Sequence, residues 1–131
     1  MIKLICISFV LMMGHVTFTS FNAPQNFESL LCKEWKLNYF EEGGRRQMPD
    51  AAEENDRMTF HTDHTAEFIE ARESKDGIWQ YDPANKKLVI LDRVTKEKMT
   101  MKIISITKTE LVLVFMDGEN EDSKVHLMAV K

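Results

Sequence analysis

Most of the chain after residue 32 alternates between apolar and polar positions, which is the pattern of a β-strand with one buried face. The alternation is clear around Trp35, at Met58 and Phe60, and again at Ala66 and Phe68. Further apolar segments continue the pattern over residues 78–81, 87–91, 99–103, 111–116 and 125–130. Together these segments predict about eight strands of ordinary length.

Short polar segments with turn-forming residues separate the predicted strands. Examples are Asp76 with Gly77, residues 62–65 and residues 82–85. Links this short join antiparallel neighbours, because a parallel pair needs a crossover of about a dozen residues or more. Closing such a meander into a barrel removes its exposed edges. The sequence therefore predicts an all-β fold, an eight-stranded antiparallel meander barrel.

Two segments depart from the strand pattern. Phe27, Leu30 and Leu31 have the spacing of one helix face, which predicts a short N-terminal helix that plugs one end of the barrel. Residues 41–55 are expected to form a long loop at the opposite mouth, with a flexible root at Gly43 and a short helix after Pro49. In that position the loop would act as a lid.

The first twenty residues have the pattern of a secretory signal peptide. Lys3 precedes an apolar run over residues 4–13, and small and polar residues follow it. The run is too short to span a membrane, which takes about 20 apolar residues. A buried N-terminal strand or helix is the alternative. We therefore expect a signal peptide over residues 1–20 and a barrel domain over residues 21–131 that is secreted or periplasmic and has no membrane span. Cys6 lies inside the apolar run, so a lipid anchor is not expected.

Composition and charge narrow the possible partners. The chain has 131 residues, enough for one domain, with 17 Lys and Arg against 21 Asp and Glu. A net charge of −4 does not provide the basic field that attracts nucleic acid, so no nucleic-acid partner is expected. The two cysteines cannot form a disulfide scaffold, and removal of the signal peptide would leave only Cys32.

Four segments resemble small bacterial secreted lipocalin-like domains: residues 30–37, with Trp35 and Leu37, residues 58–68, residues 77–92, with Trp79 and Tyr81, and residues 104–113. The resemblance implies an extracytoplasmic barrel that holds a small apolar ligand. Two positions depart from the family pattern. Lys33 stands where the family has a glycine before the tryptophan, and His64 stands where it has the glycine of a hairpin.

The barrel interior is the candidate binding site for a small hydrophobic ligand. An eight-stranded barrel is just wide enough to fill itself with side chains or to hold one small ligand. The predicted ligand-binding residues are Trp35, Leu37, Tyr39, Met58, Phe60, Phe68, Trp79, Met99, Met101 and Phe115. The alternative is a protein-interaction or envelope accessory domain with a filled core, which would work through its loops or through the outer faces of residues 89–91 and 112–116.

Other reactive groups are weaker candidates for a functional site. We expect neither enzymatic activity nor a bound metal or cofactor. His61 and His64 supply two possible ligands, whereas zinc sites use three or four. Apolar neighbours of Cys32 should raise its pKa, and no nucleophile or phosphate-loop motif is present. Residues 117–122 are acidic, and we expect them to form a charged turn rather than a calcium-binding loop. We expect Arg45 and Arg46 to be solvated surface charges.

Overall fold

The structure, a computed structural model, describes residues 25–116 and 123–131. The signal peptide expected over residues 1–20 and the acidic turn expected over residues 117–122 lie outside the described residues. The described part contains one helix, α1 (Gln25–Leu31), followed by nine strands. The strands are β1 (Glu34–Glu42), β2 (Arg45–Gln47), β3 (Arg57–Phe60), β4 (Thr65–Glu70), β5 (Glu73–Asp82), β6 (Lys87–Asp92), β7 (Lys98–Ile106), β8 (Glu110–Phe115) and β9 (Ser123–Ala129).

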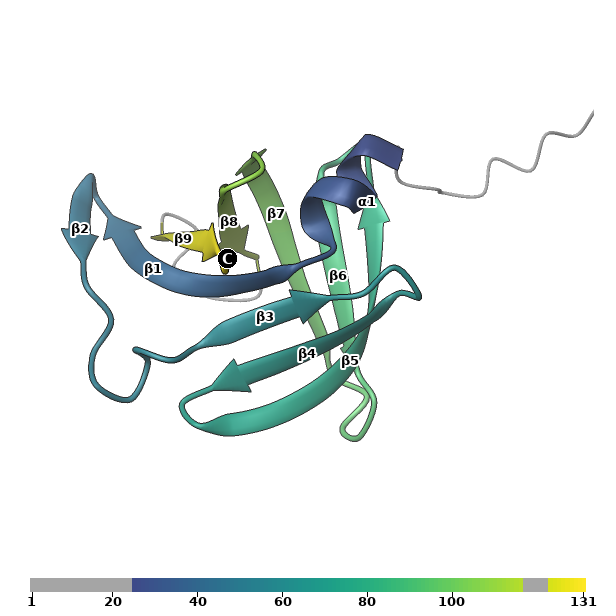
Figure 1. The fold of residues 1–131 in the computed structure, drawn as a ribbon, viewed down its shortest axis with the longest axis horizontal. Coiled ribbons are helices and arrows are strands. Elements are labelled where there is room, and N and C mark those ends of the chain that lie inside the picture. Colours follow the sequence, from purple (N-terminus) through teal and green to yellow (C-terminus); the bar gives the residue numbers. More distant parts are fainter. Residues whose placement is uncertain (1–24, 117–122) are drawn as a thin grey trace, which may run out of the picture.

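Eight of the strands form a closed antiparallel barrel (Figure 1). β1 and β3 to β9 pair in chain order, and β9 returns to pair with β1 from Trp35 opposite Ala129 to Glu42 opposite Ser123. β2 pairs with β1 alone. The predicted eight-stranded meander barrel with a short N-terminal helix is confirmed. In the part of the chain that the structure describes, no helix has the length and apolar character needed to cross a membrane.

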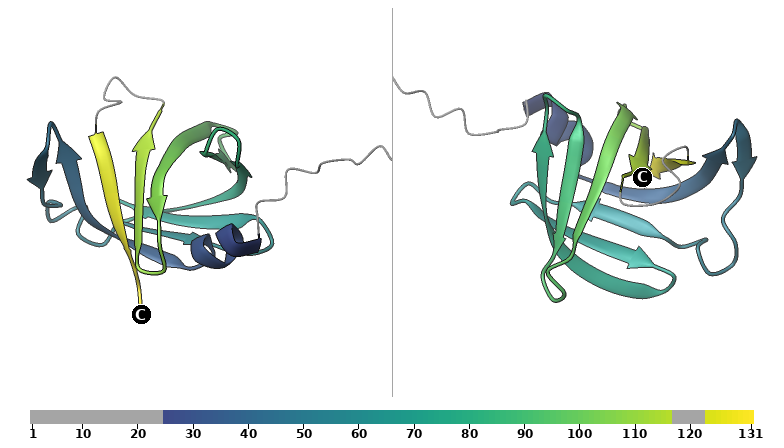
Figure 2. Two further views of the ribbon diagram at one scale, coloured as in Figure 1. Left: turned by 90° about the horizontal axis from the view of Figure 1, so that it is seen from above. Right: turned by 180° about the vertical axis from the view of Figure 1, so that it is seen from behind.

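The barrel has two different ends, and β1 runs from one to the other (Figure 2). We call the end that carries α1 and the turns at residues 61–64, 83–86 and 107–109 the closed end. We call the opposite end, with the β1–β2 hairpin and the turns at residues 71–72 and 93–97, the open end. All eight barrel strands therefore contribute residues to both ends.

The prediction of a turn at Asp76 and Gly77 is wrong. Both residues lie inside β5, and the chain reverses at Ala71 and Arg72, whose φ angles are 47° and 71°. A Cβ atom at Gly77 would lie 2.9 Å from Ile90 Cγ2 and 2.9 Å from the Leu91 carbonyl oxygen. Glycine is needed here because β5 and β6 pack closely, and not because the chain turns.

The long loop expected over residues 41–55 is also shorter than predicted. Glu41 and Glu42 continue β1, and Gly43 and Gly44 make a tight turn with φ angles of 55° and 77° before β2. Glycine tolerates these angles at little cost, which is why the hairpin forms here. The remaining loop covers residues 48–56, and it contains turns rather than the helix expected after Pro49.

Candidate binding site

Aromatic side chains fill the closed end of the barrel. Trp35 and Trp79 are fully buried, and the Phe60 ring packs edge-on against Trp79 with ring centroids 6.3 Å apart. Each indole nitrogen donates a hydrogen bond of 2.9 Å, from Trp35 to the Leu31 carbonyl and from Trp79 to the His61 carbonyl. The large rings are thus buried without an unsatisfied polar atom.

Helix α1 completes this packing from outside the strands. Its Leu31 is fully buried, and its Phe27 ring stacks on Tyr81 with the centroids 3.7 Å apart. The expectation that this helix covers one end of the barrel agrees with these contacts. Four of the predicted ligand-binding residues are at most 1% exposed and do not line the cavity described below: Trp35, Phe60, Trp79 and Met101.

The open end contains a cavity of about 390 Å³. This volume lies in the lower part of the range found for small-molecule sites, roughly 300–1,000 Å³. Its apolar wall consists of Leu37, Phe40, Met58, Phe68, Ile69, Ile90, Met99, Phe115, Val125 and Leu127. Five of the predicted ligand-binding residues line it: Leu37, Met58, Phe68, Met99 and Phe115. The ten predicted residues therefore divide between a solid core and a cavity.

Tyr39 belongs to neither group, and its predicted inward position is not observed. A β-bulge between Leu37 and Tyr39 shifts the register of β1 against β9, so that Phe40 lines the cavity in its place. Tyr39 instead stacks on His126, with the ring centroids 4.2 Å apart, and the Arg46 guanidinium lies 4.4 Å from the Tyr39 ring. The simple alternation of apolar residues in this strand carries no signal for the bulge.

Charged residues surround the mouth of the cavity. They come from the loop over residues 48–56, from the β6–β7 turn, and from β3 to β7 near the open end. The charged lining residues are Glu53, Asp56, Arg57, Glu70, Lys75, Asp76, Asp92, Glu97 and Lys98. The amino-acid sequence gives no sign of this group, because its members are far apart in the chain and only the strand register brings them together.

Asp56 fixes one end of the loop to two parts of the mouth. Its carbonyl accepts a hydrogen bond from the Leu37 N–H at 3.0 Å, and its carboxylate accepts one from the Ala71 N–H at 2.9 Å. The Asp56 N–H in turn donates to the Glu53 carbonyl at 2.9 Å. The segment expected to be a lid, residues 41–55, therefore contributes Glu53 to the cavity lining, and Asp56 directly after it also lines the cavity.

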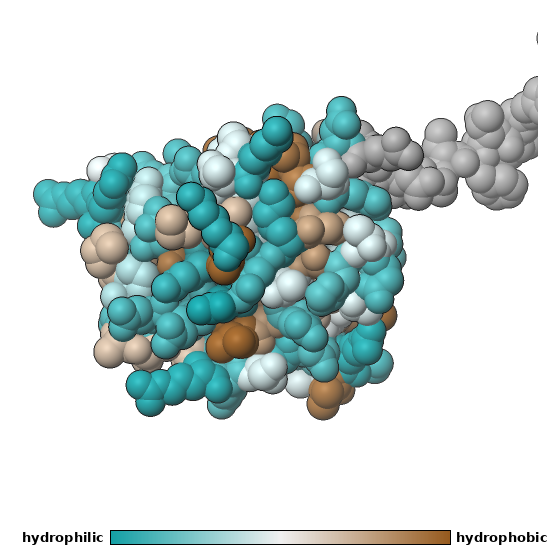
Figure 3. All heavy atoms as spheres, viewed as in Figure 1, coloured by the Kyte–Doolittle hydropathy of each residue, from teal (hydrophilic) through white to brown (hydrophobic). Residues whose placement is uncertain are grey.

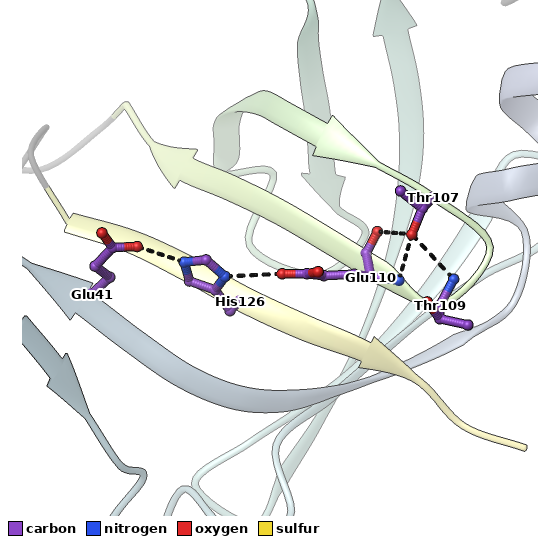
Figure 4. Close-up of polar contacts among 5 residues, drawn as sticks. All are labelled: Glu41, Thr107, Thr109, Glu110 and His126. Carbon is purple, nitrogen blue, oxygen red and sulfur yellow. Dashed lines mark hydrogen bonds and ion pairs between the residues drawn. The ribbon is translucent and has the colours of Figure 1, made fainter. Parts of the chain in front are cut away.

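A polar network on the outer wall joins the strands where the barrel closes (Figure 4). His126 on β9 lies between two carboxylates, with Nε2 2.8 Å from Glu41 on β1 and Nδ1 3.2 Å from Glu110 on β8. The Thr107 hydroxyl accepts the Glu110 N–H at 3.0 Å and so holds the turn that precedes β8. Both ring nitrogens can donate to these carboxylates together when the imidazole is protonated. This network stabilises the seam and does not line the cavity.

His61 and His64 face different partners. The His64 ring stacks on Trp79 with the centroids 4.3 Å apart, and its Nε2 lies 3.6 Å from Glu28. His61 Nε2 lies 3.7 Å from Glu67. No three His, Cys, Asp or Glu side chains of residues 25–116 and 123–131 are grouped so that they could hold a metal ion.

Cys32 lies at the junction of α1 and β1, where it packs against the buried core. Burial raises the pKa of its thiol, and the nearby carboxylates of Glu28 and Asp63 raise it further. The expected direction of this shift is confirmed. A raised pKa leaves little of the nucleophilic thiolate at neutral pH.

Comparison with known proteins supports the fold alone. No protein-family model matches the chain, and no curated protein matches its sequence. Among solved structures, the chain is similar to a DUF4847 family protein from Bacteroides vulgatus, with a TM-score of 0.59 and 13% sequence identity. The match covers 80% of this chain and 98% of that protein. The two chains therefore share a barrel fold.

Proposed function

We propose that this protein is an extracytoplasmic, lipocalin-like binding module that takes a small apolar ligand into the open-end cavity. The observation that carries the proposal is the cavity of about 390 Å³ with ten apolar wall residues, in a barrel whose other end is packed. Burial of apolar ligand surface would drive association at about 25 cal/mol per Å². The protein acts by binding and not by catalysis, in keeping with the raised pKa of the Cys32 thiol.

The alternative, an interaction domain with a filled core, has less support. It requires a barrel without a cavity and a continuous apolar patch outside. Val112, one of the residues expected to form such a patch, is buried. The exposed large apolar residues of the described chain, among them Met48, Ile69 and Val94, lie on separate elements. On the face drawn in Figure 3, hydrophobic residues are scattered among hydrophilic ones.

Binding can be measured with an environment-sensitive apolar dye. Trp35 and Trp79 both lie in the packed closed end, so tryptophan fluorescence would be a poor reporter of the cavity. We expect N-phenylnaphthylamine to become fluorescent when it is titrated with the purified chain, and an apolar ligand to displace it. Calorimetric titration of the same ligands gives an independent affinity.

A matched pair of variants tests whether the cavity is the site. Val125 lines the cavity, whereas Val89 lies on the face of β6 opposite the buried Ile90. Val125→Phe should fill part of the cavity and weaken dye binding about tenfold or more, while Val89→Phe should leave it unchanged. Melting curves check that both variants fold. Dye binding that is absent, or equal in the two variants, would contradict the proposal.

The proposed location outside the cytoplasm rests on the pattern of the first twenty residues. We expect the protein to be recovered outside the cytoplasm with an N-terminus near residue 20, as determined by N-terminal sequencing. Protein that remains in the cytoplasm with Met1 in place would refute this part of the proposal and leave the binding proposal standing.

A further inference from the structure

The inner face of the barrel changes from apolar to acidic at the mouth of the cavity. Because side chains on one face of a strand recur every second residue, the positions that follow the buried ones can be assigned to the inner face. Asp56 precedes Met58 by two residues, and Glu70 follows Phe68 by two. In the same way Asp92 follows Ile90, and Glu97 precedes Met99. Asp56, Glu70, Asp92 and Glu97, which we call the acidic ring, all line the cavity.

Three basic residues line the cavity against six acidic ones, so they offset only part of the negative charge. Lys75 shares the inner face, because it pairs with Phe68 across β4 and β5, and its ammonium lies 3.9 Å from Glu70. Arg57 and Lys98 also line the cavity, although each is next to an inward-facing methionine and its side chain starts from the other face of the strand. Arg57 also forms an ion pair of 2.6 Å with Glu34. The ring therefore keeps an excess of negative charge at the mouth.

Local hydrogen bonds to Asp92 and Asp56 leave acceptor positions free on both carboxylates. Asp92 accepts the backbone N–H groups of Thr95 and Val94, and these bonds hold its pKa below the usual range. Asp56 accepts the Ala71 N–H. Glu97 has no side-chain hydrogen bond or ion pair with the described residues. Each ionised carboxylate offers about four acceptor positions, so all of them can accept further donors from a ligand.

We propose that the ligand is a cationic amphiphile, whose apolar part fills the cavity and whose ammonium group lies within the acidic ring. This inference rests on the proposed function and names the chemical class of its ligand. A concave mouth with one sign of charge concentrates ions of the opposite sign. The same charge repels a carboxylate head group. The charge at the mouth, rather than the apolar wall, therefore disfavours fatty acids.

Three ligands with one tail and different heads test the proposal. Decylammonium, decanol and decanoate are cationic, neutral and anionic at neutral pH, and each can displace N-phenylnaphthylamine. We expect decylammonium to bind most tightly and decanoate most weakly, with at least about a tenfold difference between these two. The difference should shrink in 1 M salt, where the screening length falls to about 3 Å.

A second matched pair locates the source of the preference. Glu97→Gln removes a charge from the acidic ring, and Glu67→Gln removes the same charge from an exposed position on the outer face of β4. The first variant should reduce the advantage of decylammonium over decanoate several-fold, and the second should leave it unchanged. Decanol binding should stay the same in both variants.

The outcomes separate the two proposals. If decanol binds and decylammonium is no tighter than decanoate, or if Glu97→Gln and Glu67→Gln behave alike, the cationic preference is overturned and the proposed function survives. If none of the three ligands binds in calorimetric titrations, the proposed function fails. Tight decylammonium binding that weakens with salt and with Glu97→Gln supports both.

Discussion

The closed and open ends of the barrel are built from the same eight strands, yet one is solid and the other is hollow. At the closed end the inward positions carry two tryptophans and Phe60, and α1 adds Leu31 from outside. At the open end the cavity wall combines three phenylalanines with smaller or flexible side chains such as Val125 and Met99, and no helix of the described chain covers it. The two tryptophans and the covering helix distinguish the closed end, whereas the number of strands is the same at both ends.

The two ends also differ in how the apolar pattern stops. At the closed end the pattern continues into α1, whose Phe27 and Leu31 cover the strands. At the open end it gives way to the acidic ring, whose carboxylates must stay solvated and cannot close over the cavity. The difference predicts contrasting responses to mutation.

The largest contrast is expected from one substitution made at each end. Phe60 is 1% exposed in the packed core, and Phe115 is half-buried beside the cavity. Phe60→Ala should lower the free energy of unfolding by about 3–5 kcal/mol, whereas Phe115→Ala should cost about 1–2 kcal/mol because it borders space that is already open. Urea unfolding of both variants measures this. Equal costs would show that the two ends are packed alike.

The next largest effect is expected at Gly77, in the close contact between β5 and β6 beside Phe68 and Ile90. Gly77→Ala places a methyl group 2.9 Å from the Ile90 side chain and from the Leu91 carbonyl, and should destabilise the fold by about 1–3 kcal/mol. Gln80→Ala, at an exposed position of the same strand, should change stability by less than about 0.5 kcal/mol. A tolerated alanine at Gly77 would mean that these strands can separate and that the cavity wall is not rigid.

The seam between β1, β8 and β9 should respond more weakly than the core. His126→Phe keeps a ring to stack on Tyr39 but removes the contacts with Glu41 and Glu110. A loss of about 1–2 kcal/mol is expected from thermal unfolding, since the two carboxylates are partly exposed and can regain water. Ligand binding at the cavity should be unaffected, and a change there would link the seam to the open end.

The smallest effect on stability is expected when the pH is lowered, and it should be similar at both ends of the barrel. Hydrogen bonds from Thr65 lower the pKa of Asp63 at the closed end, and those from Thr95 and Val94 lower that of Asp92 at the open end. Because the folded-state pKa lies below the ordinary value of 3.8, the ionised forms stabilise the fold above that pH. The stabilisation is lost as the pH falls below it.

Melting temperatures recorded from about pH 5 to about pH 2 measure this loss. Asp63→Asn and Asp92→Asn should each make the decline less steep, and Asp76→Asn, inside β5, serves as a comparison at a carboxylate outside the turns. A decline that neither variant changes would assign acid sensitivity to other carboxylates.

Strand alternation predicted the barrel well because it records which face of each strand is buried. It failed where the chain departs from regular pairing. The apolar character of Tyr39 gave no sign of the bulge that turns it outward, and Asp76 with Gly77 looked like a turn although the glycine serves a close strand contact. The hairpin at Gly43 and Gly44 was hidden because its arms are polar and therefore resemble a loop.

The amino-acid order by itself determined an antiparallel barrel, its short helix and most of its inward-facing residues, because these depend on local periodicity and short connections. Tertiary structure decided which inward residues are packed and which border a cavity, because that depends on the sizes of side chains that meet from different strands. It also decided that Asp56, Glu70, Asp92 and Glu97 form one ring, since only the register of β3 to β7 brings residues so distant in the chain to the same mouth.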